Sequence, residues 1–307
     1  MKIVLLDAIT FGETSLECFK AFGEVEVFDK TSAEQTQQRI TNAAVIVTNK
    51  VVITKEHMQN ATHLKLICVA ATGTNNIDLN AAKELGIEVK NVAGYSTDSV
   101  VQHTFSMLFY LMGHSRYYDE VVKSGSYSKS GVFTDVSHPF FEIKGKKWGI
   151  IGLGEIGRGV ANVAKAFGAE VYYYSTSGVN RTEDFQRTTL EKLLQECDII
   201  SIHAPLNEKT KNLLDYEVLS TCKDGTVVLN LGRGGIISED AVAKLVDERE
   251  LYFGLDVFEK EPLAKENPLL SVQNSERLYL TPHIAWTSVE AREKLIASVC
   301  ENIKNSF

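Results

Sequence analysis

The chain has 307 residues, of which 44% are hydrophobic and 23% are charged. This composition excludes a disordered chain, a small disulfide-rich scaffold and a fibrous repeat, and at roughly 150 residues per domain the length favours two domains. The formal net charge is −8, from 40 acidic and 32 basic residues, so there is no general positive field to attract nucleic acid or an anionic membrane. We therefore expect a small molecule as the partner, with no nucleic acid and no membrane.

No apolar stretch approaches the roughly 18 residues that predict a membrane span, and the short apolar run after Met1 is too short for a signal-peptide core. We expect a cytoplasmic protein. The five cysteines are odd in number and form no C-x-x-C pair, which indicates neither a zinc site nor a disulfide framework. We predict that the protein holds no metal and that all five are reduced packing residues. They are Cys18, Cys68, Cys197, Cys222 and Cys300.

Short apolar segments alternate with helix-length segments in the first part of the chain, a pattern typical of a parallel sheet with helices packed on it. The predicted strands are residues 2–7, 24–28, 43–47, 64–70 and 87–92. Apolar residues then recur at helical spacing over residues 96–112, which predicts a long, mostly buried helix. From 123 to 147 the chain becomes polar and gains glycines, and we interpret this change as the crossing between domains.

The alternation restarts more regularly at Lys147 and predicts six strands of a doubly wound parallel sheet. These are residues 148–152, 170–174, 198–203, 226–231, 251–257 and 278–281. The last helical pattern, residues 288–303, is predicted to pack back on the N-terminal domain and to make that domain discontinuous. We therefore expect one domain from residues 1–96 and 285–307 and a second from residues 97–284.

A glycine pattern, Gly152-Leu-Gly154-Glu155-Ile156-Gly157, follows the first of these strands and opens a helix. In this context the pattern predicts a dinucleotide site rather than a turn without a ligand. Gly152 allows the tight turn, Gly154 lets the backbone approach the pyrophosphate, and Gly157 lets the helix pack closely on the strand. The amides at the helix N-terminus favour the bound phosphates.

The residue that selects between NAD and NADP is not evident in the sequence. An NAD site usually has an acidic residue at the end of the second strand, where this chain has Ser175-Thr-Ser177. Without a carboxylate a 2′-phosphate is not repelled, and Arg181 is a distant candidate for its counter-charge. Alternatively, Ser175 binds the ribose of NAD through its hydroxyl. Both cofactors stay open, with NAD slightly favoured.

Three polar motifs follow the later strands, where ligands of open α/β sheets bind. They contain Arg233 in Asn-Leu-Gly-Arg-Gly-Gly, Glu261 in Asp-Val-Phe-Glu-Lys-Glu-Pro, and His283 in Thr-Pro-His. Reduction of a 2-keto acid needs a cation that holds the carboxylate and polarises the carbonyl, which suits Arg233. His283 suits the role of proton donor to the new alkoxide. Glu261 would orient the imidazole and stabilise its protonated form.

With these motifs the chain resembles D-2-hydroxyacid dehydrogenases over nearly its whole length. The resemblance implies two Rossmann-like domains, a doubly wound dinucleotide-binding domain (97–284) inserted in a smaller flavodoxin-like substrate-binding domain (1–96 and 285–307). It implies Arg233, Glu261 and His283 as the catalytic set, and Asp256 in contact with the nicotinamide carboxamide. Substrate-binding residues are then Thr72, Gly73, Arg233, His283 and Trp286. Cofactor-binding residues are Thr72, Gly152, Gly154, Glu155, Ile156, Gly157, Ser175, Ala204, Pro205, Leu231, Gly232, Asp256 and Ala285.

Within the family, residues 92–99 and the Thr-Pro-His-Ile-Ala-Trp block are similar to glycerate dehydrogenases, the hydroxypyruvate reductases. This implies reduction of hydroxypyruvate or glyoxylate to D-glycerate or glycolate with NAD(P)H, in a cleft between domains whose hinges lie near residues 91–97 and 281–285. Trp286 either lines the substrate pocket or plugs the space between domains. D-lactate or another D-2-hydroxyacid dehydrogenase and a dinucleotide-sensing, corepressor-like protein are the alternatives. The resemblance also implies a homodimer, which the aromatic-rich residues 113–141 would fit.

Overall fold

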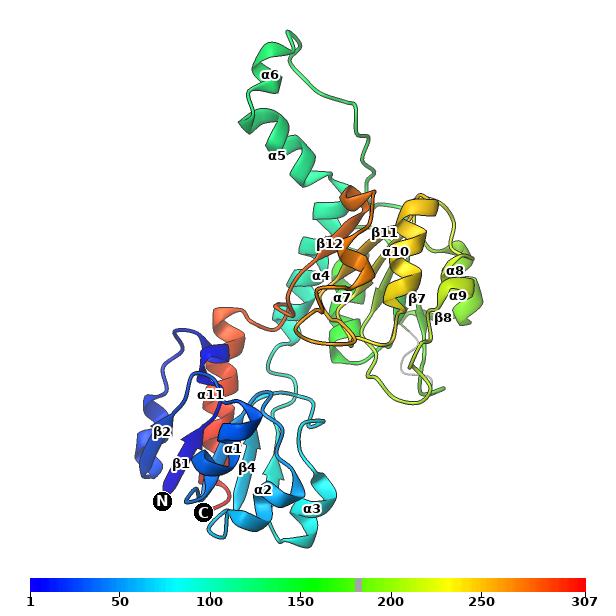
Figure 1. Ribbon diagram of the computed structural model, residues 1–307. Helices are drawn as coiled ribbons and strands as arrows, with labels where there is room; N and C mark the ends of the chain where they lie inside the picture. The colour runs from blue at the N-terminus through cyan, green and yellow to red at the C-terminus, as the bar shows by residue number, and fades with distance from the viewer. Residues whose placement is uncertain (180–183) are drawn as a thin grey trace. The chain divides into compact units, whose positions relative to one another are not determined.

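The computed structural model describes residues 1–179 and 184–307. The chain divides into two compact units, each described here by itself. The first unit consists of Met1–Ser96 and Trp286–Phe307, and the second of Thr97–Ala285 (Figure 1). Among the described helices, none combines the length and apolarity that crossing a bilayer requires.

The first unit is built on a parallel sheet with the strand order β2-β1-β3-β4-β5, the order of flavodoxin-like folds. Its strands are β1 (Lys2–Leu5), β2 (Glu24–Val27), β3 (Val45–Thr48), β4 (Leu66–Val69) and β5 (Glu88–Lys90). One face packs against α11 (Val289–Lys304) and the 3-10 helices η1 (Ala8–Phe11) and η2 (Glu17–Phe22). The other face packs against α1 (Ala33–Ile40), α2 (Lys55–Asn60) and α3 (Leu79–Glu84). The core of this unit therefore joins the two ends of the chain.

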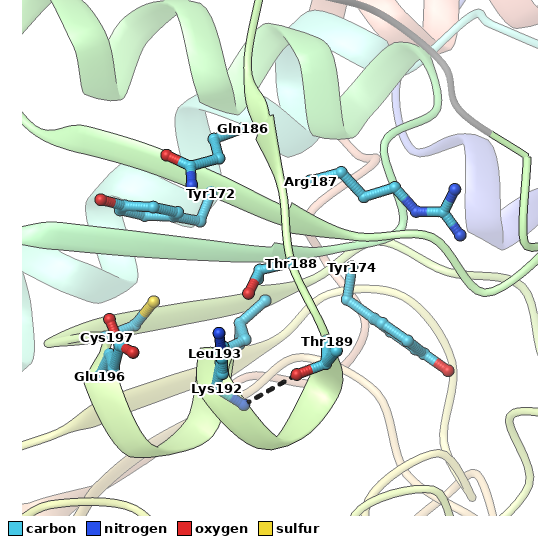
Figure 2. A pocket seen from close by; sticks show the side chains of 10 residues that line it. All are labelled: Tyr172, Tyr174, Gln186, Arg187, Thr188, Thr189, Lys192, Leu193, Glu196 and Cys197. Atoms are coloured by element: carbon cyan, nitrogen blue, oxygen red, sulfur yellow. Dashed lines mark hydrogen bonds between the residues drawn. The ribbon is translucent and has the colours of Figure 1, made fainter.

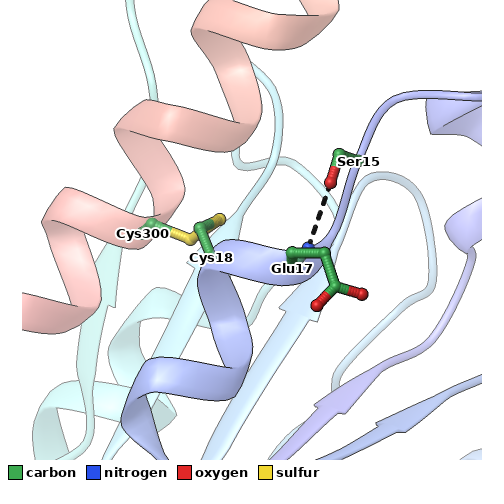
Figure 3. Close-up of a disulfide and its surroundings, with 4 residues drawn as sticks. All are labelled: Ser15, Glu17, Cys18 and Cys300. Atoms are coloured by element: carbon green, nitrogen blue, oxygen red, sulfur yellow. Dashed lines mark hydrogen bonds between the residues drawn. A yellow bond between two sulfur atoms is a disulfide. The ribbon is translucent and has the colours of Figure 1, made fainter.

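A disulfide joins Cys18 on η2 to Cys300 on α11 (Figure 3). The prediction that all five cysteines are reduced was therefore wrong for this pair. The two residues are 282 positions apart in sequence, and only the return of α11 onto the first unit brings them together, so their spacing carried no signal. Cys68, Cys197 and Cys222 are free and buried, as expected, and burial raises the pKa of each thiol to about 12.

The second unit is built on a parallel sheet with the order β12-β11-β10-β9-β6-β7-β8. The strand order reverses between β6 and β9, the topological switch point at which open α/β sheets bind ligands. The strands are β6 (Lys147–Ile151), β7 (Glu170–Tyr174), β8 (Gln186–Arg187), β9 (Ile199–Ile202), β10 (Val227–Asn230), β11 (Tyr252–Leu255) and β12 (Leu278–Leu280). Six strands were predicted; among the described residues there are seven, because the two exposed, polar residues of β8 give no apolar pattern.

Helices cover both faces of this sheet. α4 (Thr97–Met112) and α7 (Glu155–Ala166) share one core cluster, and α8 (Leu190–Glu196), α9 (Tyr216–Leu219) and α10 (Glu239–Glu248) share the other. The short helices α5 (Ser115–Lys123) and α6 (Ser126–Lys129) lie on an arm that projects from this unit (Figure 1). Residues 123–147 belong wholly to the second unit, so the interpretation of this stretch as a domain crossing was wrong. Its glycine-rich, polar composition reflects a surface arm instead.

Candidate active site

The glycine pattern forms the turn between β6 and α7. The space that a Cβ would find differs at each of the three glycines. Gly152 has φ +93°, and a Cβ there would lie 2.8 Å from the backbone N of Ala204 at the end of β9. A Cβ on Gly157 would overlap the carbonyl oxygen of Gly152. A Cβ on Gly154 would meet no atom of the described residues within 4 Å. The turn is therefore tight on its protein side and open at Gly154, where a ligand can approach.

A cavity of about 560 Å³ opens at this turn, beside the switch point of the sheet. Four of the predicted cofactor residues line it: Gly152, Gly154, Ser175 and Pro205. The Ser175 hydroxyl donates to the carbonyl of Val179 at 2.7 Å, and its oxygen lies 3.3 Å from the Ser177 hydroxyl. The wall also contains both a cation and an anion that the sequence analysis did not consider, Lys209 and Glu208. Arg181 lies outside the described residues.

His203 also lines the pocket, and the sequence analysis missed it although it ends a predicted strand. Neither of its two buried ring nitrogens has a hydrogen-bond partner among the described residues. Burial lowers the pKa of His203 to about 3, so the ring is neutral and presents one donor and one acceptor nitrogen. An unpaired buried imidazole in a pocket is satisfied when a polar ligand binds there. Together with the open face of Gly154, it fits a dinucleotide.

The other predicted cofactor residues of this unit are not part of the lining of this pocket. Glu155 and Ile156 form the first turn of α7 with Gly157. A Cβ on Gly232 would lie 2.9 Å from the carbonyl oxygen of Ala204, so the turn that carries Leu231 and Gly232 after β10 packs against the end of β9.

A buried asparagine shapes the turn that carries Arg233. The side chain of Asn230, the last residue of β10, accepts from the amide of Gly232 at 3.1 Å and donates to the carbonyl of Arg233 at 2.9 Å. The Arg233 guanidinium donates to the carbonyl of Gly232 at 2.9 Å. Asn230 is fully buried, so it holds the turn from within the protein. The Asn-x-x-Arg spacing in the sequence is therefore the spacing of one hydrogen-bonded turn.

The structure brings Glu261 and His283 into direct contact. Glu261 Oε2 lies 2.8 Å from Nδ1 of His283, and its other oxygen accepts from the amide of Phe258 at 3.1 Å. The two side chains keep 30% and 23% of their surface exposed, so the carboxylate orients the imidazole while the site stays open to a ligand. A Cβ on Gly234 would overlap the carbonyl of Phe258, which shows that the Arg233 turn packs backbone to backbone against the loop before Glu261.

Asp256 follows β11 and is almost completely buried. Its carboxylate accepts from the amide of Ala285 at 2.9 Å, from the amide of Ile284 at 2.8 Å and from the hydroxyl of Thr281 at 2.6 Å. Two predicted cofactor residues, Asp256 and Ala285, are thus hydrogen-bonded to each other. The segment between Thr281 and Ala285 contains His283.

The remaining predicted residues lie in the first unit. The Thr72 hydroxyl donates to the carbonyl of Val92 at 3.3 Å, and Gly73 is the next residue of the same loop. Trp286 packs at the edge of the core there, with its ring edge-on to Tyr95 at 6.1 Å between centroids. These contacts give Trp286 a packing role within its own unit.

A larger cavity, of about 640 Å³, lies between β7, β8 and α8 and contains none of the predicted site residues. Figure 2 shows Tyr174 and Arg187 extending to the side away from Glu196 and Cys197. Size alone therefore does not identify the site, whereas the turns after β6, β9, β10, β11 and β12 lie at one edge of the sheet because the strands are parallel.

Comparison with known proteins gives a consistent picture. A family model described as the NAD-binding domain of D-isomer-specific 2-hydroxyacid dehydrogenases matches residues 105–285. A hydroxypyruvate reductase of Blautia hydrogenotrophica is 34% identical, with 99% of this chain and 96% of the relative covered. A glycerate dehydrogenase of Methylorubrum extorquens is 32% identical, with 99% and 95% covered. The crystal structure of a D-lactate dehydrogenase of Aquifex aeolicus with NAD and lactic acid aligns with a TM-score of 0.82 at 26% identity, covering 99% of this chain and 94% of that one.

Proposed function

The chain belongs to the D-isomer-specific 2-hydroxyacid dehydrogenase family, and on this basis we propose that it reduces hydroxypyruvate or glyoxylate to D-glycerate or glycolate. The reaction class, NAD(P)-linked interconversion of a keto acid and a D-2-hydroxy acid, follows from the family. The substrate is our proposal, supported by the names of the hydroxypyruvate reductase and glycerate dehydrogenase relatives.

One observation supports the catalytic assignment above the others: the 2.8 Å contact between Glu261 Oε2 and His283 Nδ1. With Nδ1 donating to the carboxylate, Nε2 is left to face the substrate and to carry the proton that the reduced oxygen takes up. Glu261 holds the ring in that orientation and stabilises its positive charge. Arg233, on the adjoining turn, is proposed to bind the carboxylate and polarise the carbonyl through its planar fork of donors.

The cofactor is a nicotinamide dinucleotide, which supplies the hydride when bound. The residues proposed to hold it are the glycine turn, His203 and the rest of the 560 Å³ pocket. NAD is slightly favoured because the matching family model is described as NAD-binding. The Ser175 hydroxyl is proposed to take the place of the usual acid in binding the ribose.

Initial rates test both proposals. NADH and NADPH are each assayed against hydroxypyruvate, glyoxylate, pyruvate and phenylpyruvate. We expect the highest kcat/KM for hydroxypyruvate or glyoxylate, and a higher value with NADH than with NADPH. A preference for pyruvate would reassign the substrate to D-lactate, and no turnover with any keto acid would favour the corepressor-like alternative.

The first unit is proposed to bind the substrate through Thr72, Gly73 and Trp286, and the second to bind the dinucleotide. Gly73→Pro removes a backbone amide of the substrate loop, and we expect it to raise KM for the keto acid with an unchanged dissociation constant for NADH. An unchanged KM would reject the assignment. Because the reaction draws on a diffusing dinucleotide, we place the enzyme in the cytoplasm, which cell fractionation tests.

We also propose that the protein is a homodimer formed through the arm of the second unit. Apolar side chains of the arm are strongly exposed, with Phe133 at 89% and Phe140 and Phe141 at 65% each. The arm is nevertheless ordered by its own hydrogen bonds, such as that from the Tyr118 hydroxyl to the carbonyl of His138 at 2.7 Å. Several strongly exposed apolar side chains on one short segment are the feature on which we base this proposal. Light scattering should give a dimer, and a monomer would reject the proposal.

A further inference from the structure

The segment that carries His283 is held by one buried carboxylate. Asp256 is 1% exposed, and it accepts the Thr281 hydroxyl and the Ile284 amide on Oδ1 and the Ala285 amide on Oδ2, at 2.6, 2.8 and 2.9 Å. Hydrogen bonds to a charged, buried acceptor are among the strong ones in proteins. The donors lie on both sides of His283 in sequence, so Asp256 fixes the backbone before and after the imidazole.

His283 itself has a backbone conformation that needs such support. Its φ is +55°, in the left-handed region that residues other than glycine seldom adopt. Its amide donates to the carbonyl of Thr281 at 2.9 Å, which closes a tight turn. This conformation directs the imidazole to Glu261 at 2.8 Å. If the turn relaxed, the ring would lose the geometry on which its proposed role depends.

A second histidine extends the arrangement into α4. Nε2 of His103 lies 3.2 Å from the Thr281 hydroxyl oxygen and 3.6 Å from Asp256 Oδ1. The hydroxyl has one proton, which it donates to Asp256, so it accepts from His103. His103 therefore carries a proton on Nε2. Burial lowers the pKa of His103 more than the charge of Asp256 raises it, which fits a neutral ring acting as donor.

We propose that Asp256 is a positioning residue that acts through Thr281, Ile284 and Ala285 to hold His283 in its left-handed turn and against Glu261, with His103 bracing the Thr281 hydroxyl. The proposal rests on the proposed role of His283 as proton donor. It gives Asp256 a function distinct from the carboxamide contact that the family resemblance implies.

Thr281→Val tests this contact with the smallest change, because it removes the hydroxyl and keeps the shape of the side chain. We expect kcat to fall at least tenfold and the alkaline limb of its pH profile to move to lower pH, since the imidazole loses the carboxylate that stabilises its protonated form. Thr281→Ser keeps a hydroxyl and should restore both. Thr226→Val is the matched control, because this buried hydroxyl donates to Cys197 elsewhere in the same unit. A Thr281→Val enzyme with the wild-type kcat and pH profile would overturn the proposal.

The Asp256→Asn variant distinguishes a role of Asp256 in positioning His283 from a direct contact with the nicotinamide carboxamide. Isothermal titration with NADH and with ADP-ribose, which lacks the nicotinamide, should give wild-type dissociation constants for both, while kcat falls at least tenfold. If the dissociation constant rose tenfold or more for NADH but not for ADP-ribose, and kcat at saturating NADH stayed unchanged, Asp256 would be assigned to the carboxamide contact. That result would overturn the proposal.

Hydrogen exchange in the cofactor-free protein gives a test independent of turnover. The Ile284 and Ala285 amides should exchange at least tenfold faster in Thr281→Val than in Thr226→Val, and equal exchange would contradict the proposal. If the wild-type enzyme reduced no keto acid, the proposed function would fail, but this exchange measurement would still decide whether the hydroxyl supports the turn.

Discussion

Lowering the pH should reduce the folding stability of the second unit, because His203 is buried in its neutral form. Burial lowers the pKa of this side chain to about 3, against about 6.5 for an exposed histidine. Between these values the unfolded chain binds a proton that the folded chain does not, so stability falls as the pH drops below about 6.5. At 1.36 kcal/mol per pH unit, and with the unfolded imidazole almost fully protonated at pH 5, the loss between pH 8 and pH 5 is about 2 kcal/mol.

The comparison uses a matched pair of cofactor-free proteins, one with His203 and one with His203→Phe, both in a Trp286→Phe background. The remaining tryptophan, Trp148, is fully buried in β6, so its fluorescence reports urea unfolding of the second unit. His103 is present in both proteins, so its contribution to the pH dependence cancels in the comparison. Between pH 8 and pH 5, the free energy of unfolding of the second unit should fall by about 2 kcal/mol more in the protein with His203 than in the His203→Phe variant. Equal losses would refute the reasoning that the imidazole is buried without a partner.

Three further predictions follow from particular contacts. Gly234→Ala forces a Cβ into the carbonyl of Phe258 and should lower the free energy of unfolding by about 1–3 kcal/mol. Gly154→Ala should leave the free energy of unfolding unchanged and raise the dissociation constant for NADH. The reverse pattern would contradict the assignment of the two glycines. Cys18→Ala should lower the stability of the first unit by about 2–4 kcal/mol, the usual contribution of a disulfide, and reduced wild-type protein should match the variant in urea unfolding. Glu261→Gln should keep NADH binding but shift the alkaline limb of kcat to lower pH, and superimposable pH profiles would contradict the role of the carboxylate.

Much of the fold could be predicted because its strands are buried on both faces. β3, β4, β9 and β10 are mostly apolar, with at most one polar residue each, and every residue is buried, a pattern that stands out in sequence. β8 has two exposed polar residues and carries no such pattern. The arm was misread for a related reason: glycine and polar residues mark surface chain in general, and they do not tell a crossing between domains from an excursion within one.

At the site, the motif residues could be found but the groups that hold them could not. Glu261 and His283 were paired from their chemistry, and the structure places them 2.8 Å apart. Asn230, Thr281 and His103 act through hydrogen bonds that depend on which loops meet in space. His203 could have been found by sequence, because it ends a strand at the same sheet edge as the other motifs, the rule already used for Arg233 and His283.

The central claim is that His283 delivers the proton while the dinucleotide binds elsewhere in the same unit. The most direct measurement is kcat for hydroxypyruvate reduction by His283→Ala, with the NADH dissociation constant determined in parallel. We predict a fall in kcat of about 10²–10⁴-fold, the usual contribution of a positioned general acid, with NADH binding unchanged. A kcat near the wild-type value would contradict the account.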